Sequence, residues 1–321
     1  MTYPASDHFD GERFTNLDRT KTVKKGLLEV LKWRFSKRPM GHWPARAENA
    51  YSPDLPRSLG ARELAVTGVN HATDLLQFSG FNALTDPVFS ERVSPFEWIG
   101  PRRVRPPGIA FDALPRVDAV LVSHNHYDHM DLRTLARLNQ RDRPRFVVPL
   151  GNARALASAG IEGAVELDWW QEAKLGDETT ATLVPVQHWS GRSLFDRRRA
   201  LWGGFFIKRG SVSVFFAGDT GYGAHFKLIR ERLGAPDLSL LPIGAYEPRW
   251  FMKDQHINPE EAVLAHLDLG SRLSAGMHFG TFRLTDEGID DPVTALAAAR
   301  RDHGLADAAF PALHNGLTVR L

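Results

Sequence analysis

Residues 123–129 concentrate metal-binding side chains in one short stretch. The sequence there reads Ser-His-Asn-His-Tyr-Asp-His, and it directly follows an apolar run. Imidazole nitrogens and carboxylate oxygens are donors that zinc, iron and manganese accept in proteins. Four donors from one tight loop cannot surround a single tetrahedral ion and still leave a position for water. The spacing therefore predicts two metal ions, the first bound by His124 and His126. The second ion would be bound by Asp128 and His129.

Three further candidate ligands stand in similar settings later in the chain. Each follows a run of strand-forming residues: His188, Asp219 and His278. Strand ends at one edge of a sheet lie close together, so we expect these side chains to meet the 123–129 loop. Asp219 is the natural bridging ligand, because a carboxylate offers one oxygen to each ion. Two adjacent cations share a water and lower its pKa, which predicts a metal-bridging hydroxide as the nucleophile.

The composition excludes several other kinds of chemistry. The chain of 321 residues has no cysteine, so disulfides, thiolate catalysis and cysteine-ligated metals are excluded. No serine or lysine stands in a recognisable nucleophile motif. Hydrophobic residues make up 43% of the chain, which is enough for a sizeable core. The net charge of +2 and the lack of a basic stripe beyond the N-terminal segment give no reason to expect a nucleic-acid partner.

Short β-type runs alternate with helical stretches from residue 63 onward, as is typical of an α/β protein. The expected strands are residues 63–69, 74–78, 83–86, 119–123, 145–149, 181–185, 204–208, 212–217 and 238–242. The expected helices are residues 131–138, 152–158, 226–233, 259–267 and 292–303. We expect one catalytic domain over residues 61–321, preceded by an N-terminal extension over residues 1–60.

The N-terminal extension is basic and dotted with proline. Residues 21–35 within it predict an amphipathic helix. Its apolar face comprises Val23, Leu27, Leu28, Leu31 and Phe35. Two interpretations are open: the helix lies on an anionic membrane surface, or it docks on the main domain. The sequence shows no signal peptide and no apolar run of membrane-spanning length. We therefore expect a cytoplasmic protein, with peripheral association at the inner membrane face through this helix as a further expectation.

The donor pattern resembles that of the metallo-β-lactamase superfamily, which implies an αββα sandwich. Longer stretches resemble N-acyl-phosphatidylethanolamine-hydrolysing phospholipase D over roughly residues 40–321, and the chain looks like a bacterial relative. These stretches are residues 67–73, 84–90, 99–101, 187–189, 216–222, 242–253 and 278–282. The most specific stretch is residues 242–253, Pro-Ile-Gly-Ala-Tyr-Glu-Pro-Arg-Trp-Phe-Met-Lys, which leads into Gln255-His256.

The resemblance implies a role for each site residue. It implies seven ligands to two zinc ions. The first ion would be bound by His124, His126 and His188, and the second by Asp128, His129 and His278. Asp219 would bridge the two ions. Asp128, Asp219 and His256 are the implied catalytic residues. His256 would contact a phosphate oxygen or protonate the leaving alkoxide. Asp86 and His71 are expected behind the ligands, where they would orient them. Iron or manganese would suit the same donors.

The reaction implied by the resemblance converts N-acyl-phosphatidylethanolamine to N-acylethanolamine and phosphatidic acid. In the family, two subunits build a lipid-facing groove, so a homodimer is a further expectation. Two alternatives stay open. The first is a lactonase or phosphodiesterase that acts on a soluble metabolite. The second is a non-catalytic, metal-stabilised membrane-binding module.

Residues 91–107 and the N-terminal arm depart from the family pattern. The lipid-facing surface cannot therefore be carried over residue by residue. Aromatic side chains that would line either an acyl channel or the core are Trp33, Phe35, Trp169, Trp170, Trp189, Phe195, Trp250 and Phe251.

Overall fold

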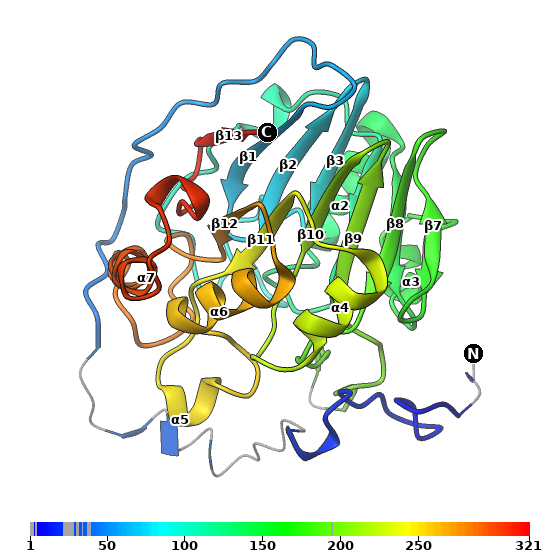
Figure 1. Ribbon diagram of the computed structural model, residues 1–321. Coiled ribbons are helices and arrows are strands. Elements are labelled where there is room, and N and C mark those ends of the chain that lie inside the picture. The colour runs from blue at the N-terminus through cyan, green and yellow to red at the C-terminus, as the bar shows by residue number, and fades with distance from the viewer. Residues whose placement is uncertain are drawn as a thin grey trace.

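Two β-sheets pack face to face, and helices cover both outer faces (Figure 1). The structure is a computed structural model that describes residue 3 and residues 5–21, 29, 32–33, 35–36, 40–193 and 195–321. The layer order is the αββα sandwich that the sequence predicts. Most of the predicted helix over residues 21–35 lies outside the described residues, including Val23, Leu27, Leu28 and Leu31.

The first sheet has seven strands in the order β13-β1-β2-β3-β4-β5-β6. These strands are β1 (Leu64–Asn70), β2 (Thr73–Phe78), β3 (Phe81–Thr85), β4 (Ala119–Leu121), β5 (Arg145–Pro149), β6 (Val165–Leu167) and β13 (Thr318–Arg320). Strands β3 to β6 run parallel, whereas β1, β2 and β3 are antiparallel neighbours. The turn between β1 and β2 therefore lies at the same edge as the carboxyl ends of β3 and β4.

The second sheet has six strands in the order β12-β11-β10-β9-β8-β7. These strands are β7 (Glu172–Lys174), β8 (Thr179–Val184), β9 (Gly204–Arg209), β10 (Val212–Phe216), β11 (Leu238–Pro242) and β12 (Leu273–Met277). Strands β10, β11 and β12 run parallel, and β9 is antiparallel to both β8 and β10. The carboxyl ends of β8, β10, β11 and β12 consequently share one edge.

Helices cover both outer faces, and two of them begin with side-chain caps. The first sheet is covered by α2 (Leu132–Asp142) and α3 (Ala153–Ala157). The second is covered by α4 (His225–Leu233) and α6 (Pro259–Leu269), beside which lie α5 (Arg249–Met252) and α7 (Asp291–Asp302) (Figure 1). Three short 3-10 helices span Arg19–Lys21, Phe111–Ala113 and Asp307–Ala309. Asp131 caps α2 by accepting from the N–H of Thr134, and Asn258 and Glu261 form a capping box on α6.

Apolar side chains from both sheets fill the space between them. Trp202, Phe205 and Phe215 are fully buried there. A second cluster lies under α2 and α3 and includes Leu135 and Leu156. Each such side chain contributes roughly 1.5–3 kcal/mol by leaving water. Within the described part of the chain, no helix is both long and apolar enough to cross a bilayer.

All nine expected strands and all five expected helices are present, with ends shifted by a few residues. The residues 274–277 that precede His278 belong to β12. Strands β6, β7 and β13 were not expected, because each has three residues and only part of each is buried. The expected strand over residues 83–86 ends at Thr85, since Asp86 turns out of it with φ 33°. The domain boundary at residue 60 stays a prediction.

Candidate metal centre

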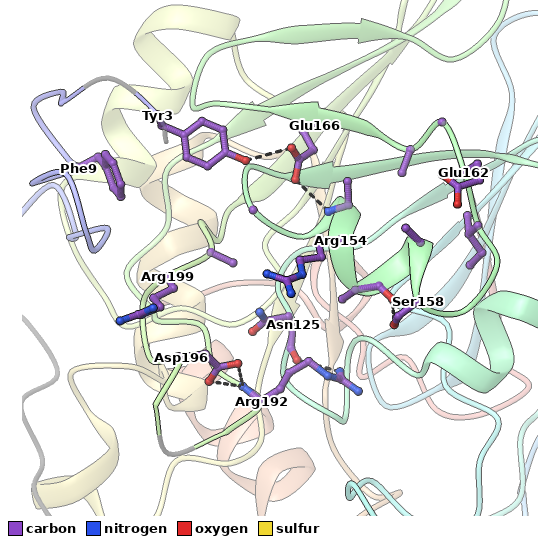
Figure 2. A pocket seen from close by; sticks show the side chains of 18 of the residues that line it. Tyr3, Phe9, Asn125, Arg154, Ser158, Glu162, Glu166, Arg192, Asp196 and Arg199 are labelled. Carbon is purple, nitrogen blue, oxygen red and sulfur yellow. Dashed lines mark hydrogen bonds between the residues drawn. The ribbon is translucent and has the colours of Figure 1, made fainter. Parts of the chain in front are cut away.

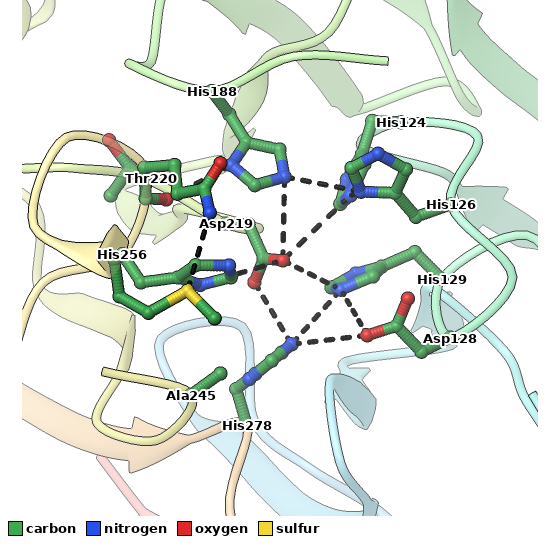
Figure 3. A network of polar contacts seen from close by, with 12 residues as sticks. His124, His126, Asp128, His129, His188, Asp219, Thr220, Ala245, His256 and His278 are labelled. Atoms are coloured by element: carbon green, nitrogen blue, oxygen red, sulfur yellow. Dashed lines mark hydrogen bonds and ion pairs between the residues drawn. The ribbon is translucent and has the colours of Figure 1, made fainter. Parts of the chain in front are cut away.

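Each candidate ligand lies at one edge of the sandwich, just past the carboxyl end of a strand. Residues 124–129 follow β4 of the first sheet. His188, Asp219 and His278 follow β8, β10 and β12 of the second sheet. Figure 3 shows the side chains of both sheets converging around Asp219. The topology thus brings together donors that are separated by up to about 150 positions in the sequence.

The first group of donors consists of His124, His126, His188 and Asp219, each offering an atom within 4.8 Å of the others. Nδ1 of His126 lies 2.9 Å from Nε2 of His124 and 3.3 Å from Nε2 of His188. Oδ2 of Asp219 is 3.8 Å from His124 Nε2 and 3.6 Å from His188 Nε2. These are the residues expected around the first ion.

The second group contains Asp128, His129 and His278, the residues expected around the second ion. The Nε2 atoms of His129 and His278 are 3.1 Å apart. Oδ2 of Asp128 lies 3.5 Å from the first of these nitrogens and 3.6 Å from the second. Asp219 contacts this group too, with Oδ1 3.0 Å from His278 Nε2 and Oδ2 3.1 Å from His129 Nε2. Asp219 therefore lies between the two groups, where the sequence predicts a bridging ligand.

Hydrogen bonds behind the cluster fix which nitrogen of each ring faces it. Nδ1 of His129 donates to Oδ2 of Asp86 at 2.6 Å. Nδ1 of His188 donates to the carbonyl of Gln255 at 3.0 Å. A carboxylate and a carbonyl can only accept, so Nδ1 carries the proton in both rings. Nε2 of each ring then presents a lone pair to the cluster.

His124 is fixed in the same way through a neighbouring hydroxyl. Oγ of Ser123 donates to Oδ2 of Asp86 at 2.6 Å, and the main-chain N–H of Ser123 donates to Oδ1 at 2.6 Å. Because its proton is used, Oγ accepts from Nδ1 of His124 at 2.9 Å. A third Nε2 lone pair therefore faces the cluster. The buried carboxylate of Asp86 thus lies behind the ligands, as expected.

The cluster fits divalent cations. Three ring lone pairs and the two carboxylates of Asp128 and Asp219 converge in a buried space, which is repulsive without positive charge between them. Among the described residues, His126 Nε2 and His256 Nδ1 are buried polar atoms without a hydrogen-bond partner. Zinc, iron and manganese all accept this set of nitrogen and oxygen donors. The two groups are compatible with a dinuclear metal site.

The pKa shifts follow from the same arrangement. Burial lowers the pKa of His126 to about 3 and that of His188 to about 4, so both rings are neutral, as metal ligands must be. Burial also disfavours a charged His129, but Asp219 and Asp128 outweigh it and raise its pKa well above the usual 6.5. The carboxylates therefore favour positive charge at the centre of the cluster.

His71 and His256 both border the cluster. Nε2 of His71 lies 3.1 Å from Oδ2 of Asp128, and the main-chain carbonyl of His71 accepts from the N–H of His278 at 2.7 Å. His71 also offers an atom to the second group of donors, closer than a purely orienting residue requires. Nδ1 of His256 lies 3.9 Å from Oδ2 of Asp219. Sequence reasoning missed Gln255, because it acts through its carbonyl and no side-chain pattern marks it.

A cavity of about 950 Å³ reaches the 124–129 loop at Asn125 (Figure 2). It is bounded by α3, the loop over residues 191–200 and the N-terminal residues Tyr3 and Phe9. Its lining includes Asn125 but, among the described residues, none of the seven candidate ligands. The cavity therefore touches the back of the 124–129 loop, away from the converging donors.

Three of the aromatic residues that were expected to line either an acyl channel or the core lie in different surroundings. The Trp189 ring packs 4.3 Å from the His126 ring, so it borders the cluster. Trp169 lies in the core between the sheets. Trp33 stacks on Phe251 at 5.0 Å, which places this residue against α5.

Comparisons with known proteins agree with this arrangement. A family model described as "Beta-lactamase superfamily domain" matches residues 82–279. An uncharacterized protein of Mycobacterium tuberculosis is 42% identical over 306 residues, which are 93% of this chain and 81% of that protein. N-acyl-phosphatidylethanolamine-hydrolyzing phospholipase D 1 of Caenorhabditis elegans is 39% identical over 267 residues, which are 79% of this chain and 74% of that protein.

A solved structure shares the fold. It is Igni18, described as a novel metallo hydrolase from the archaeon Ignicoccus hospitalis, with a TM-score of 0.60 and 21% identity. The match covers 81% of this chain and 98% of that chain. At this identity the likeness concerns the fold alone.

Proposed function

The chain belongs to the beta-lactamase superfamily and, within it, to the family of N-acyl-phosphatidylethanolamine-hydrolysing phospholipase D, and from this premise we propose that it cleaves N-acyl-phosphatidylethanolamine to N-acylethanolamine and phosphatidic acid. Membership in this superfamily makes the protein a metallo-hydrolase. The observation that carries the proposal is the convergence of the seven expected ligands and His256 on one buried cluster. A phosphodiester is the substrate class that such a pair of metal groups suits.

We propose zinc as the bound ion at both positions. Bound divalent cations would supply Lewis-acid chemistry, by activating water and neutralising charge that develops on the phosphate oxygens. The chain's part is to hold them with ligands whose rings are already oriented. Asp86 and the carbonyl of Gln255 do this for His129 and His188.

The substrate would reach the cluster at Asp128 and His256. Their side chains are 15% and 12% exposed, whereas those of His129 and His278 are fully buried. A phosphodiester that enters here meets Asp128, His256 and the partly exposed His126 before the fully buried donors.

His256 suits a hydrogen-bonding role toward the phosphate. Burial holds the pKa of His256 well below 6.5, so the ring is neutral in the free protein. A neutral ring keeps one N–H, which can donate to a phosphate oxygen. Of the two roles that the resemblance implies for His256, this electrostatic one agrees better with its environment than proton donation does.

The specific stretch over residues 242–253 positions His256. The guanidinium of Arg249 donates to the carbonyl of His256 at 2.8 Å and to Oε2 of Glu261 at 2.6 Å. The carboxylate of Glu287 accepts from the main-chain N–H groups of Ala245 and Glu247 at 2.7 and 3.0 Å. The stretch over residues 242–253, the most specific part of the resemblance, therefore holds the main chain of His256 in place.

A lipid substrate also calls for contact with a membrane surface, which we propose to be peripheral. Phe35 is 78% exposed and Trp250 is 46% exposed. The ammonium group of Lys32 lies 5.2 Å from the ring of Trp250. Basic and aromatic side chains at the 242–253 stretch, such as Lys32 and Trp250, suit the interface of an anionic membrane. A homodimer and a cytoplasmic location stay predictions.

Lipid hydrolysis tests the proposal directly. Zinc-loaded protein is incubated with N-acyl-phosphatidylethanolamine in mixed micelles, and released N-acylethanolamine is measured by mass spectrometry. The wild type is expected to release it, and Asp219→Ala is expected to abolish release. Glu162 is an exposed carboxylate in the cavity of Figure 2, which is lined by none of the candidate ligands among the described residues. Glu162→Gln is therefore the control and should stay active.

The same assay separates the alternatives. Turnover that survives Asp219→Ala would exclude the mechanism. Cleavage of bis(p-nitrophenyl) phosphate without cleavage of the lipid would favour an enzyme of soluble metabolites. A wild type that binds two equivalents of zinc but cleaves neither substrate would favour a non-catalytic module.

A further inference from the structure

The N-terminal arm, defined here as residues 5–16, packs into the sandwich. Phe9 and Phe14 are 6% and 1% exposed, and both belong to the core cluster between the sheets. The main-chain N–H of Phe14 donates to the carbonyl of Arg198 at 2.8 Å. Part of the N-terminal extension is thus held against the loop that follows His188.

Asn16 ends the arm in a buried position next to a candidate metal ligand. Asn16 as a whole is only 3% exposed. Its Oδ1 accepts from the main-chain N–H of His188 and from Nε1 of Trp202, both at 3.1 Å. An amide oxygen has two lone pairs, and these two donors use both. Asn16, which lies more than one hundred positions from the 124–129 loop, therefore provides the hydrogen-bond acceptor for the main-chain N–H of His188.

We infer that Asn16 is a positioning residue for the metal centre. It restrains His188 at the backbone, while the carbonyl of Gln255 restrains the ring through Nδ1 at 3.0 Å. Under both restraints, Nε2 of His188 faces Oδ2 of Asp219 at 3.6 Å. A buried N–H without an acceptor is costly, so removing Oδ1 would force the His188 segment to shift. The inference rests on the proposed function, because it takes His188 as a ligand.

His8 anchors the other end of the arm. Its Nε2 lies 2.7 Å from Oδ1 of Asp168, its Nδ1 lies 2.6 Å from Oδ1 of Asp7, and its ring stacks on Trp169 with centroids 4.3 Å apart. Asp168 directly follows β6 of the first sheet, and His188 lies beyond β8 of the second. The arm therefore connects the two sheets and places Asn16 at the end of that connection.

The test compares metal binding by Asn16→Leu and Asn16→Asp. Leucine has a similar shape but no acceptor, whereas aspartate keeps oxygens that can accept from both donors. Metal-free protein is titrated with zinc in competition with a chromophoric chelator, and the absorption spectrum of the Co²⁺-loaded protein is recorded. We expect roughly ten- to hundredfold weaker zinc binding and shifted Co²⁺ bands for Asn16→Leu, with most of the affinity restored by Asn16→Asp.

A core variant separates positioning from general loss of stability. Phe310 is fully buried and packs beside His266 of α6. Phe310→Leu should lower the urea midpoint yet keep the zinc affinity and the Co²⁺ spectrum. If Asn16→Leu does not fold, His8→Leu tests the arm from its anchored end. Weaker zinc binding by folded His8→Leu would support the inference, and unchanged binding would overturn it.

Two further results would overturn the inference. The first is wild-type zinc affinity and an unchanged Co²⁺ spectrum in folded Asn16→Leu. The second is an equal loss of affinity in Phe310→Leu. Wild-type protein that binds no transition metal would instead contradict the proposed function, so the two failures are distinguishable.

Discussion

Nδ1 of His129 donates a 2.6 Å hydrogen bond to Oδ2 of Asp86, and this contact turns the other nitrogen of the ring toward the cluster. The same carboxylate oxygen accepts from Ser123, which fixes His124 in turn. Burial raises the pKa of Asp86, while the hydrogen bonds from His129 and Ser123 oppose that rise. One carboxylate thus orients a candidate ligand in each metal group.

We expect Asp86→Asn to weaken zinc binding about ten- to hundredfold, because asparagine has one carbonyl oxygen where the carboxylate has two acceptors. Chelator competition on metal-free protein measures this loss. Asp74→Asn is a matched control, since burial and the neighbouring Asp86 raise the pKa of Asp74 well above 3.8 and keep it neutral. An equal effect of the two substitutions would show that Asp86 acts only by filling space.

His256→Ala is expected to lower kcat about 10²–10³-fold while two zinc ions stay bound, because it removes a donor to the phosphate. His256→Gln keeps an amide N–H and should lose less. Steady-state kinetics and elemental analysis of the same preparations measure both quantities. Loss of zinc from the alanine variant would point to a ligand role for His256 instead.

Metal-free protein should lose stability as the pH falls from 6.5 to 4. His188 binds a proton near pH 6.5 in the unfolded chain, whereas burial lowers its pKa in the folded protein to about 4. The unfolded state therefore binds more protons in this window, so the free energy of unfolding rises with pH there. A shift of this size corresponds to about 3 kcal/mol.

Urea unfolding of metal-free protein at several pH values measures this dependence. His129, whose pKa is raised chiefly by Asp219 and Asp128 against burial, contributes in the opposite sense above pH 6.5, so the comparison stays below that value. His188→Gln removes the titrating ring and should give a shallower slope. An identical slope in the variant would contradict the assignment.

His71→Asn should weaken binding of one of the two zinc equivalents about tenfold, because it removes the contact of Nε2 with Asp128. The main chain of His71 has φ 51°, a left-handed conformation that asparagine tolerates well, so the change isolates the ring. Arg143 also has φ 51° and lies at the end of α2, so Arg143→Asn is a matched control. Isothermal titration calorimetry should resolve the affected equivalent, and equal effects of the two changes would argue against a role for the ring.

Trp98→Ser should reduce sedimentation with vesicles that contain anionic phospholipid. Phe96, Trp98 and Ile99 are 53%, 74% and 51% exposed on one loop, and Trp favours the headgroup region of a membrane. Val93, three residues before Phe96, belongs to a buried cluster against which Tyr127 of the metal-ligand segment packs. Leu267→Ser, an exposed apolar position on α6, is the control. Equal vesicle binding by wild type and both variants would show that this loop adds nothing to the membrane contact proposed for Phe35, Lys32 and Trp250.

The seven candidate ligands could be found from the sequence because each stands just past a strand-forming run. The side chains of His188, Asp219 and His278 meet because the strands that precede them, β8, β10 and β12, run in the same direction. Asn16 and Gln255 could not be found, since their role depends on which backbone groups the folded chain brings beside them. His71 was expected to act behind the ligands, yet its ring lies among them. That difference depends on the tight turn between β1 and β2, which spacing alone does not specify.

The split origin of the donors, with residues 124–129 on one sheet and His188, Asp219 and His278 on the other, has a consequence for biosynthesis. A growing polypeptide cannot assemble the complete coordination set until residue 278 has been made and both layers have closed. Metal ions would therefore bind to the already folded protein, and the metal supply of the cell would affect which ion is bound. Capture of the ions should in turn hold the two layers together and raise the melting temperature of the loaded protein.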